Sequence, residues 1–148
     1  MIGRITAGLL AVIMLTMLPL KMKAVHEAER MENAVRSVLR TAYEEIMADR
    51  YIDKDKWDKL KNGLNATGIP VSVSITVGTI LIGRTGKTLR CTYTDEILEE
   101  ISDEGSILDV GGKLVSISAV PVSENPIAGI ANMFWVSYIP VKKICVGG

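Results

Sequence analysis

Side chains that usually carry out catalysis or bind metals are scarce in this sequence. The chain of 148 residues contains one histidine, His26, and two cysteines, and aromatic residues make up only 5% of it. Zinc sites and Ser/His or Cys/His catalysis need several such residues, and zinc ligands recur at characteristic short spacings that are not found here. We therefore expect no catalytic residues, no metal site and no cofactor, and we do not expect an enzyme.

An excess of charge of one sign is also lacking. Lysine and arginine together number 17, aspartate and glutamate together number 17, and the formal net charge is +0. A nucleic-acid-binding domain would carry a clustered basic face. We therefore expect no nucleic-acid partner, and no motif indicates a small-molecule substrate. Beyond its apolar N-terminus the chain is long enough for one compact domain.

The two cysteines, Cys91 and Cys145, lie far apart in the sequence. In an oxidising compartment they could pair as a disulfide across strands. Two separate thiols agree with the sequence at least as well, so both alternatives stay open at this point.

The longest apolar run lies at the N-terminus. From Ile5 to Leu20 the chain carries no charge, Arg4 precedes this run, and Lys21 and Lys23 follow it. A helix needs about 20 residues to cross a bilayer core, and lysine side chains that reach back to the interface supply the missing length. The sequence thus predicts a membrane-spanning helix. The residues expected to form its membrane and assembly surface are Ile5, Ala7, Gly8, Leu9, Leu10, Val12, Ile13, Leu15 and Pro19.

A cleaved signal peptide and a buried core helix are the competing interpretations of this run. A signal peptide would place small residues before its cleavage site, and residues 21–24, Lys-Met-Lys-Ala, match that pattern poorly. A core helix of so small a protein would not be apolar around its whole circumference. Because a short N-terminus is most simply kept inside, we expect residues 1–24 to span the cell membrane once, with residues 25–148 forming an extracytoplasmic domain.

An amphipathic helix is predicted directly after the lysines. Its apolar residues recur at alternating steps of three and four, with charged residues between them. No glycine or proline interrupts the chain between Leu20 and Ala48, so we predict one helix from Ile5 to Ala48, bent near Pro19 because proline cannot donate to the carbonyl of Leu15. The predicted apolar stripe comprises Ala28, Met31, Val35, Val38, Leu39, Ala42, Tyr43 and Ile46.

For the remainder of the chain the sequence predicts short helices and strands. Asp53 is a typical N-cap, with Ile52 and Trp57 as a hydrophobic staple, and Gly68 ends the helix that follows. Alternating valines and serines then indicate a half-buried strand. We predict strands at Val71–Val77 and Thr88–Tyr93 and a short acidic helix at Asp95–Ser102 with Thr94 as its N-cap. We further predict a hairpin of Ile107–Val110 and Leu114–Val120, a helix at 125–133, and a last strand at Phe134–Val146.

These elements predict an α+β fold in which a long N-terminal helix, first membrane-spanning and then amphipathic, packs on a small antiparallel sheet of about four strands. The aromatic residues Phe134, Trp135 and Tyr138 are expected in the core, or alternatively in contact with a neighbouring subunit.

Three local patterns resemble functional motifs without completing them. Residues 83–88, Gly-Arg-Thr-Gly-Lys-Thr, end like a phosphate-binding loop, but Leu81 stands where that motif needs glycine and a strand follows instead of a helix. The acidic residues 95–104 lack calcium-loop spacing and suit a solvated helix. Asn65-Ala66-Thr67 fits a glycosylation sequon and equally fits the end of a helix. We therefore expect a hairpin turn, a solvated face and a helix end.

The order of these parts resembles the type IV pilin superfamily. More narrowly, residues 51–57, Tyr-Ile-Asp-Lys-Asp-Lys-Trp, and residues 64–68, Leu-Asn-Ala-Thr-Gly, resemble pilin-like proteins of tight-adherence or conjugation-like clusters of Gram-positive bacteria. The resemblance implies a membrane-stored helix that later packs against the helices of other subunits. Family members carry a glutamate five residues after the processed glycine. Counted from Gly3, that position is Gly8, which favours a minor or accessory subunit over a major pilin.

From these observations we expect a structural, pilin-like subunit of a filament, secretion or conjugation apparatus, located in the cell membrane or in an extracellular filament. Its expected partners are the membrane and other pilin-like subunits or copies of itself. The alternative is a single-pass membrane-anchored module whose sheet domain binds a ligand or a partner protein.

Overall fold

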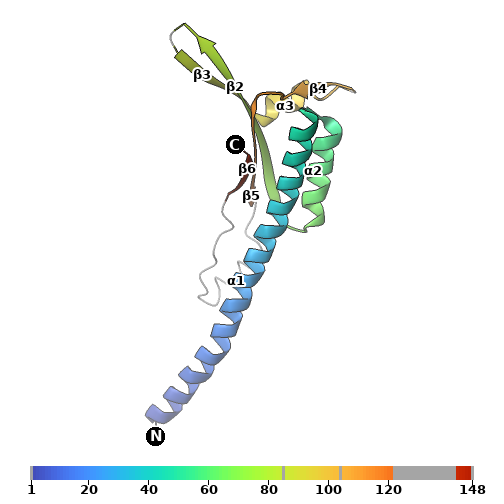
Figure 1. Cartoon of the computed structure of the whole chain (residues 1–148). Coiled ribbons are helices and arrows are strands. Elements are labelled where there is room, and N and C mark those ends of the chain that lie inside the picture. The colour runs from blue at the N-terminus through green and yellow to red at the C-terminus, as the bar shows by residue number, and fades with distance from the viewer. Residues whose placement is uncertain (1, 85, 104, 122–142, 148) are drawn as a thin grey trace. The chain divides into compact units, whose positions relative to one another are not determined.

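The computed structural model describes residues 2–84, 86–103, 105–121 and 143–147 (Figure 1). The chain divides into two units: residues 1–31 with 124–140, and residues 32–123 with 141–148. We describe each unit by itself, and the predicted membrane boundary after residue 24 stays a prediction. The elements are α1 Ile2–Asp49, β1 Tyr51–Asp53, α2 Lys54–Ala66, β2 Val71–Gly83, β3 Gly86–Thr92, α3 Thr94–Glu100, β4 Ile107–Asp109, β5 Leu114–Pro121 and β6 Ile144–Gly147.

Helix α1 has the predicted extent and continues through Pro19. From Glu32 onward it belongs to the second unit, where Val35, Leu39 and Ile46 are each at most 2% exposed. This part of the predicted apolar stripe is confirmed, since residues three and four apart share one helix face. The helix ends because Arg50 adopts a positive φ of 63°, while its N–H still donates to the carbonyl of Ile46 at 2.8 Å. The predicted bend at Pro19 stays a prediction.

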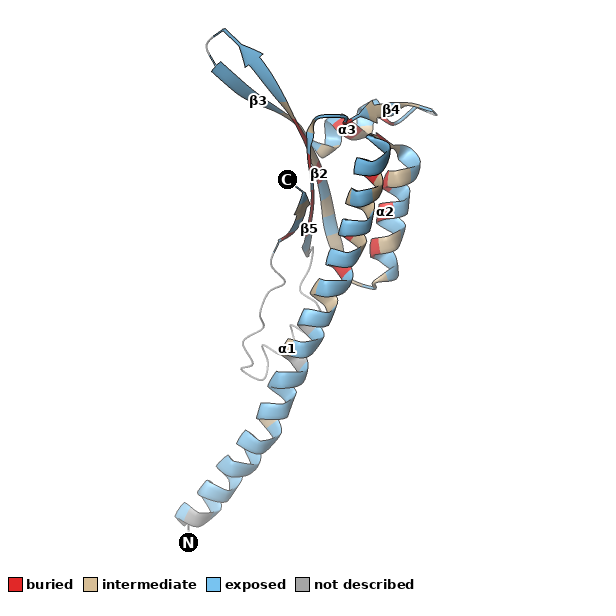
Figure 2. Ribbon diagram, in the orientation of Figure 1, coloured by how far each residue is buried: buried red, intermediate tan, exposed pale blue. Residues whose placement is uncertain are grey.

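Helix α2 begins and ends where its sequence signals predict. The Asp53 carboxylate accepts a hydrogen bond from the backbone N–H of Lys56 at 2.8 Å, which satisfies one of the helix's otherwise unpaired donors. Trp57, Leu60 and Leu64 form the buried face, and Gly68 follows the helix with a φ of 72°. Figure 2 shows the buried positions of α2 in red.

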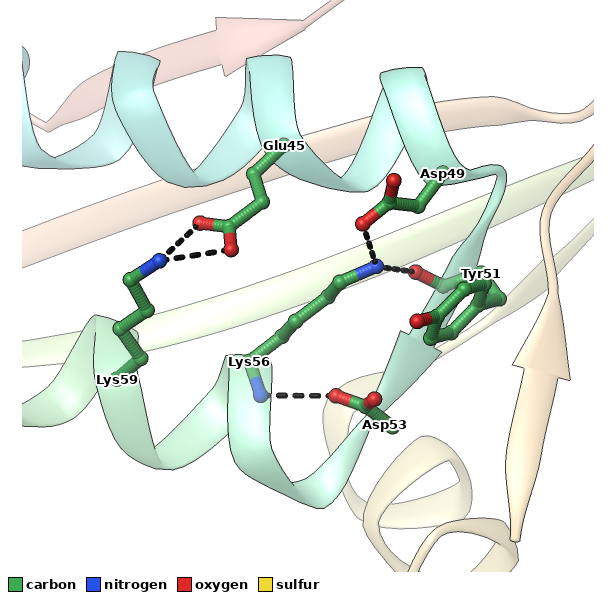
Figure 3. A network of polar contacts seen from close by, with 6 residues as sticks. All are labelled: Glu45, Asp49, Tyr51, Asp53, Lys56 and Lys59. Atoms are coloured by element: carbon green, nitrogen blue, oxygen red, sulfur yellow. Dashed lines mark hydrogen bonds and ion pairs between the residues drawn. The ribbon is translucent and has the colours of Figure 1, made fainter. Parts of the chain in front are cut away.

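Polar contacts join the end of α1 to the start of α2 (Figure 3). The ammonium of Lys56 is 2.8 Å from the Asp49 carboxylate, donates to the backbone carbonyl of Tyr51 at 3.1 Å, and lies 3.5 Å from the centre of the Tyr51 ring. One helical turn further, Lys59 reaches both carboxylate oxygens of Glu45 at 2.7 and 2.8 Å. The Lys56 side chain is only 9% exposed, so its charge is compensated by contacts instead of water.

The main sheet is antiparallel with the strand order β3-β2-β5-β6. Apolar and polar residues alternate along β2, and successive side chains of a strand point to opposite sides, so one face of β2 is apolar and the other polar. Ile75 and Val77 lie in the core with Val115 and Ile117 of β5. On the other face the hydroxyls of Ser74 and Ser118 are hydrogen-bonded at 2.7 Å. The predicted α+β class, with a long N-terminal helix and a small antiparallel sheet, is therefore confirmed.

The prediction that Thr94 is the N-cap of α3 is wrong. The Thr94 hydroxyl does not cap α3: the N-cap is Tyr93, whose side chain makes no capping bond. Instead the Thr94 hydroxyl accepts from the backbone N–H of Ile75 at 2.9 Å and donates to the Ile75 carbonyl at 3.1 Å. The β2–β3 pairing ends at Val77 and Thr92. Two residues further along β2, the Thr94 hydroxyl takes the place of a strand partner for the backbone of Ile75.

The predicted hairpin of Ile107–Val110 with Leu114–Val120 is wrong. Strand β4 pairs with β1, with Ile52 opposite Leu108, whereas β5 pairs with β2 and β6. The reason is the turn between them. A two-residue hairpin of type I′ needs positive φ at both central residues, but of Gly111 and Gly112 only Gly112 has it, at 72°. The turn therefore redirects the chain instead of folding β5 back along β4.

Strand β6 covers only the end of the predicted last strand. The expected helix at 125–133 and the residues Phe134, Trp135, Tyr138 and Pro140 lie outside the described part of the chain.

Candidate membrane and assembly surface

The first turns of α1 present apolar side chains on every side. Successive helical residues rotate by about 100°, so neighbours such as Leu9, Leu10 and Val12 point in different directions. Exposure ranges from 47% at Ile13 to 74% at Leu15. Among the described residues, α1 is the one helix long and apolar enough to cross a membrane, and no residue of that stretch is buried. The exposed large apolar residues are Ile5, Leu9, Leu10, Val12, Ile13, Met14, Leu15, Leu18 and Leu20.

The hydroxyl groups in this stretch are satisfied within the helix. Thr16 donates to the backbone carbonyls of Val12 at 2.9 Å and Ile13 at 3.0 Å, and Thr6 donates to the carbonyl of Gly3 at 3.1 Å. A hydroxyl that bonds its own helix needs no water. The polar atoms of these two side chains are thus compatible with an apolar surrounding, where an unpaired hydroxyl would cost several kcal/mol.

Small residues occupy one part of this surface. Ala7 and Ala11 are four residues apart and therefore share a face, and Gly8 adjoins them. A Cβ built on Gly8 would meet nothing within 4 Å, so the helix backbone is uncovered at this position. Small residues at such spacing let a second helix approach closely in a membrane. The sequence prediction for Ala7 and Gly8 is thus compatible with the geometry of this helix.

Charged side chains adjoin the apolar stretch on its C-terminal side. Lys21, Lys23 and His26 are exposed. Within the described residues, no group of three or more His, Cys, Asp or Glu is placed to hold a metal ion.

The three other sequence patterns lie at a strand turn, at the start of a helix and at the end of a helix. Gly83 ends β2 and lies opposite Gly86, the first residue of β3, so a strand and not a helix begins at Gly86. Asp95 and Glu96 are exposed in the first turn of α3, where the helix dipole favours carboxylates. Asn65 and Thr67 mark the end of α2, whose C-cap is Thr67.

Cys91 and Cys145 are free thiols. Cys91 lies on β3 and Cys145 on β6, which are the two edge strands of the main sheet. The two strands are three strand spacings of about 4.8 Å apart, or about 14 Å, and the two cysteines are further offset along the strands, because Cys91 lies opposite Gly78 and Cys145 opposite Ser118. A disulfide needs Cα atoms within about 7 Å. This arrangement favours two separate thiols, and the possible disulfide stays a prediction.

A surface that the sequence analysis did not single out lies on the β2–β3 hairpin. Ile80, Leu81, Ile82 and Leu89 are exposed there, with Ile82 at 80%. Their apolar character was visible in the sequence, but a strand segment of this kind is normally buried. Only the strand pairing shows that this segment extends past β5.

Two shallow cavities also occur in the second unit. One, of about 240 Å³, lies between α1 and α2 and is lined by residues including Val38, Leu60 and Gly63. The other, of about 340 Å³, is lined by residues including Trp57 and Asp95. No protein-family model, curated protein or solved structure matches this chain.

Proposed function

We propose that this chain is a pilin-like structural subunit, minor or accessory, that is anchored in the cell membrane by α1 and assembles with other subunits through the same helix. The observation that carries the proposal is the exposed, uncharged apolar surface from Ile5 to Leu20 on a helix that runs without a break to Asp49. The C-terminal part of that helix contributes Val35, Leu39 and Ile46 to the core of the second unit. One helix thus carries an exposed apolar surface at its start and contributes to the core of a folded domain further along.

Burial of the first turns of α1 in an apolar surrounding is strongly favourable. Removing one large aliphatic side chain from water gains about 1.5–3 kcal/mol. Several such side chains on α1 together outweigh the entire stability of an ordinary domain, about 5–15 kcal/mol. A helix with this surface will not stay in water. Lipid supplies the required surrounding, and the flanking Lys21 and Lys23 would lie at the membrane interface.

The case for assembly rests on the small residues. An anchor alone needs only apolar side chains, and Leu or Ile at every position would serve. The uncovered backbone at Gly8, beside Ala7 and Ala11, is suited to close helix–helix contact. The resemblance to the type IV pilin superfamily supports the same interpretation, since its members use such a helix both in the membrane and between subunits.

Anchoring is tested by Leu10→Lys. Replacing an apolar residue near the helix centre by lysine changes the insertion free energy by about 3–4 kcal/mol, so we expect the chain to leave the membrane fraction after carbonate extraction. Met22→Lys is the matched control: it adds the same charge beside Lys21 and Lys23, and extraction should be unchanged. Full retention of the Leu10→Lys chain in the membrane would contradict the proposal.

Assembly is tested separately by Gly8→Leu, which keeps the helix apolar but fills the uncovered position. We expect normal membrane retention together with loss of the higher oligomers trapped by chemical crosslinking in native membranes. Gly3→Ala, a small change at the other glycine of α1 whose added Cβ would also meet nothing, should leave them intact. If Gly8→Leu leaves both properties unchanged, the helix is only an anchor, and the alternative of a single-pass binding module is supported instead.

A further inference from the structure

Strand β2 is longer than its partner on one side. It has 13 residues, and its pairing with β5 ends where Gly78 lies opposite Leu114. From Thr79 to Gly83 it pairs with β3 alone, up to Gly83 opposite Gly86. Figure 1 shows the resulting hairpin extending past β5. Among the described residues, no strand lies against the other side of β2 between Thr79 and Gly83.

The backbone groups on that open side can be assigned. The N–H and C=O of Ile75 point toward the β3 side of β2, because both bond the hydroxyl of Thr94, which follows β3. Backbone groups alternate between the two sides of an antiparallel strand. Ile80 and Ile82 are an odd number of residues from Ile75, so their N–H and C=O groups face the open side. Within the described part of the chain, this edge therefore presents four backbone hydrogen-bonding groups that have no strand partner.

The open edge lacks the features that normally prevent strand association. Exposed edges are usually protected by charged residues, proline or a bulge. Residues 79–83, Thr-Ile-Leu-Ile-Gly, contain neither charge nor proline, and their ladder with β3 has no bulge. The charges of the hairpin strands, Lys87 and Arg90, are on β3, which already forms the opposite edge. The protection is present on the β3 side and missing on the β2 side.

We propose that this edge pairs with the same edge of a second copy of the chain, antiparallel and centred on Leu81. In that register Leu81 faces Leu81 of the second copy, and Ile80 faces its Ile82. The residues that expose backbone groups, Ile80 and Ile82, then form two hydrogen-bonded pairs on either side of a non-hydrogen-bonded pair at Leu81. The edge is self-complementary, as a twofold symmetric contact requires.

The side chains of the open edge suit contact with a second copy of the chain, and the charges of β3 lie away from that contact. Residues directly opposite in an antiparallel pair point to the same face, so Ile80 and Ile82 of both copies would form one cluster. The cationic β3 strands of the two copies would be three strand spacings apart, about 14 Å, beyond the roughly 8 Å Debye length at physiological salt. The chain's own charges therefore do not oppose the contact.

Insertion of the hairpin into lipid agrees less well with the residue order. The turn at the tip carries Arg84, Gly86 and Lys87, so cations would enter the membrane first, ahead of Ile82 and Leu81. A charged side chain at the bilayer centre costs about 2.5–3.5 kcal/mol. Pairing of the edge leaves these cations in water.

The contact is short, and interfaces far below about 1,200 Å² are weak on their own. We therefore expect dimers that depend on protein concentration and become prominent when copies share one membrane. The inference does not depend on assembly through α1, because the hairpin belongs to the second unit.

The test is disulfide trapping of the full chain in detergent micelles, which cover the apolar part of α1. In a Cys91→Ser, Cys145→Ser background we compare Leu81→Cys with Thr88→Cys. Thr88 is the register partner of Leu81 on β3 and shares its face, so it is a matched control. Across the twofold axis, Cβ atoms at position 81 would be about 4.5–5.5 Å apart, near disulfide range, whereas those at position 88 would be about 14 Å apart.

We expect mild oxidation to convert Leu81→Cys to a disulfide dimer and to leave Thr88→Cys monomeric. Adding Ile80→Lys should abolish the dimer by placing like charges on the edge, and circular dichroism should show the fold retained, since Ile80 is exposed. Equal trapping at both positions, no trapping at 81, or trapping insensitive to Ile80→Lys would overturn the proposal. So would protection of Leu81→Cys from an impermeant maleimide in liposomes without any dimer, which would assign the edge to lipid.

Discussion

The contribution of the Thr94 hydroxyl to the stability of the sheet can be estimated from its two hydrogen bonds. The hydroxyl bonds both backbone groups of Ile75, at 2.9 and 3.1 Å, at the position where β3 no longer covers β2. Thr94→Val keeps the branched shape and removes both bonds at once. The Ile75 side chain is only 1% exposed, so the variant leaves an unpaired N–H and C=O next to the core.

The expected magnitude follows from these two orphaned groups. A buried donor or acceptor without a partner costs about 1–3 kcal/mol. Because both bonds are only partly buried, water can reach the groups, and we expect the lower end, about 2 kcal/mol in total for Thr94→Val. Thr94→Ser keeps the hydroxyl and loses one methyl group, so it should cost less than about 1 kcal/mol.

The assay is urea unfolding of the full chain in detergent micelles, followed by hydrogen exchange of the Ile75 amide in the folded state. Thr94→Val should lower the unfolding midpoint and expose the Ile75 amide to fast exchange, and Thr94→Ser should do neither to a comparable degree. The reasoning is refuted if the two variants have the same stability, or if the Ile75 amide stays protected in the valine variant.

Two further substitutions probe the second unit. Lys56→Met keeps the apolar stem but removes the contacts with Asp49 and Tyr51, and it should cost about 2 kcal/mol because the lysine is nearly buried. An unfolding free energy equal to that of the unaltered chain would contradict this. Gly147→Ala should release β6 from β5: the new Cβ would lie 2.2 Å from the Val115 carbonyl oxygen, and the φ of 136° suits only glycine. Faster exchange of β5 amides is the readout, and unchanged exchange would show that β6 accommodates a side chain.

Local features of the chain were largely predictable because the physics behind them is local. The apolar stripe of α1 follows from helical periodicity, so Val35, Leu39 and Ile46 could be assigned to the core without knowing what they contact. The start of α2 at Asp53 depends on one side chain and a backbone N–H three residues away. The alternation of valine and serine in β2 likewise predicted which face is buried.

Pairings between distant segments were not predictable in the same way. Ile107–Val110 and Leu114–Val120 look like a hairpin in the sequence, but β4 pairs with β1, which lies more than 50 residues earlier in the chain. Thr94 is a typical N-cap in sequence, yet its hydroxyl bonds Ile75, which lies 19 residues earlier. In each case a neighbour brought close by the fold competes with the local partner and wins.

The sequence by itself therefore determined the apolar first turns of α1, the helix ends and the α+β class, since each depends on residues within one or two turns of each other. The tertiary structure decided which strands are neighbours, that Cys91 and Cys145 lie on opposite edges, and that residues 79–83 form an open edge. Strand order and the exposure of an edge depend on where other segments of the chain begin and end. The periodicity of one segment therefore cannot predict them.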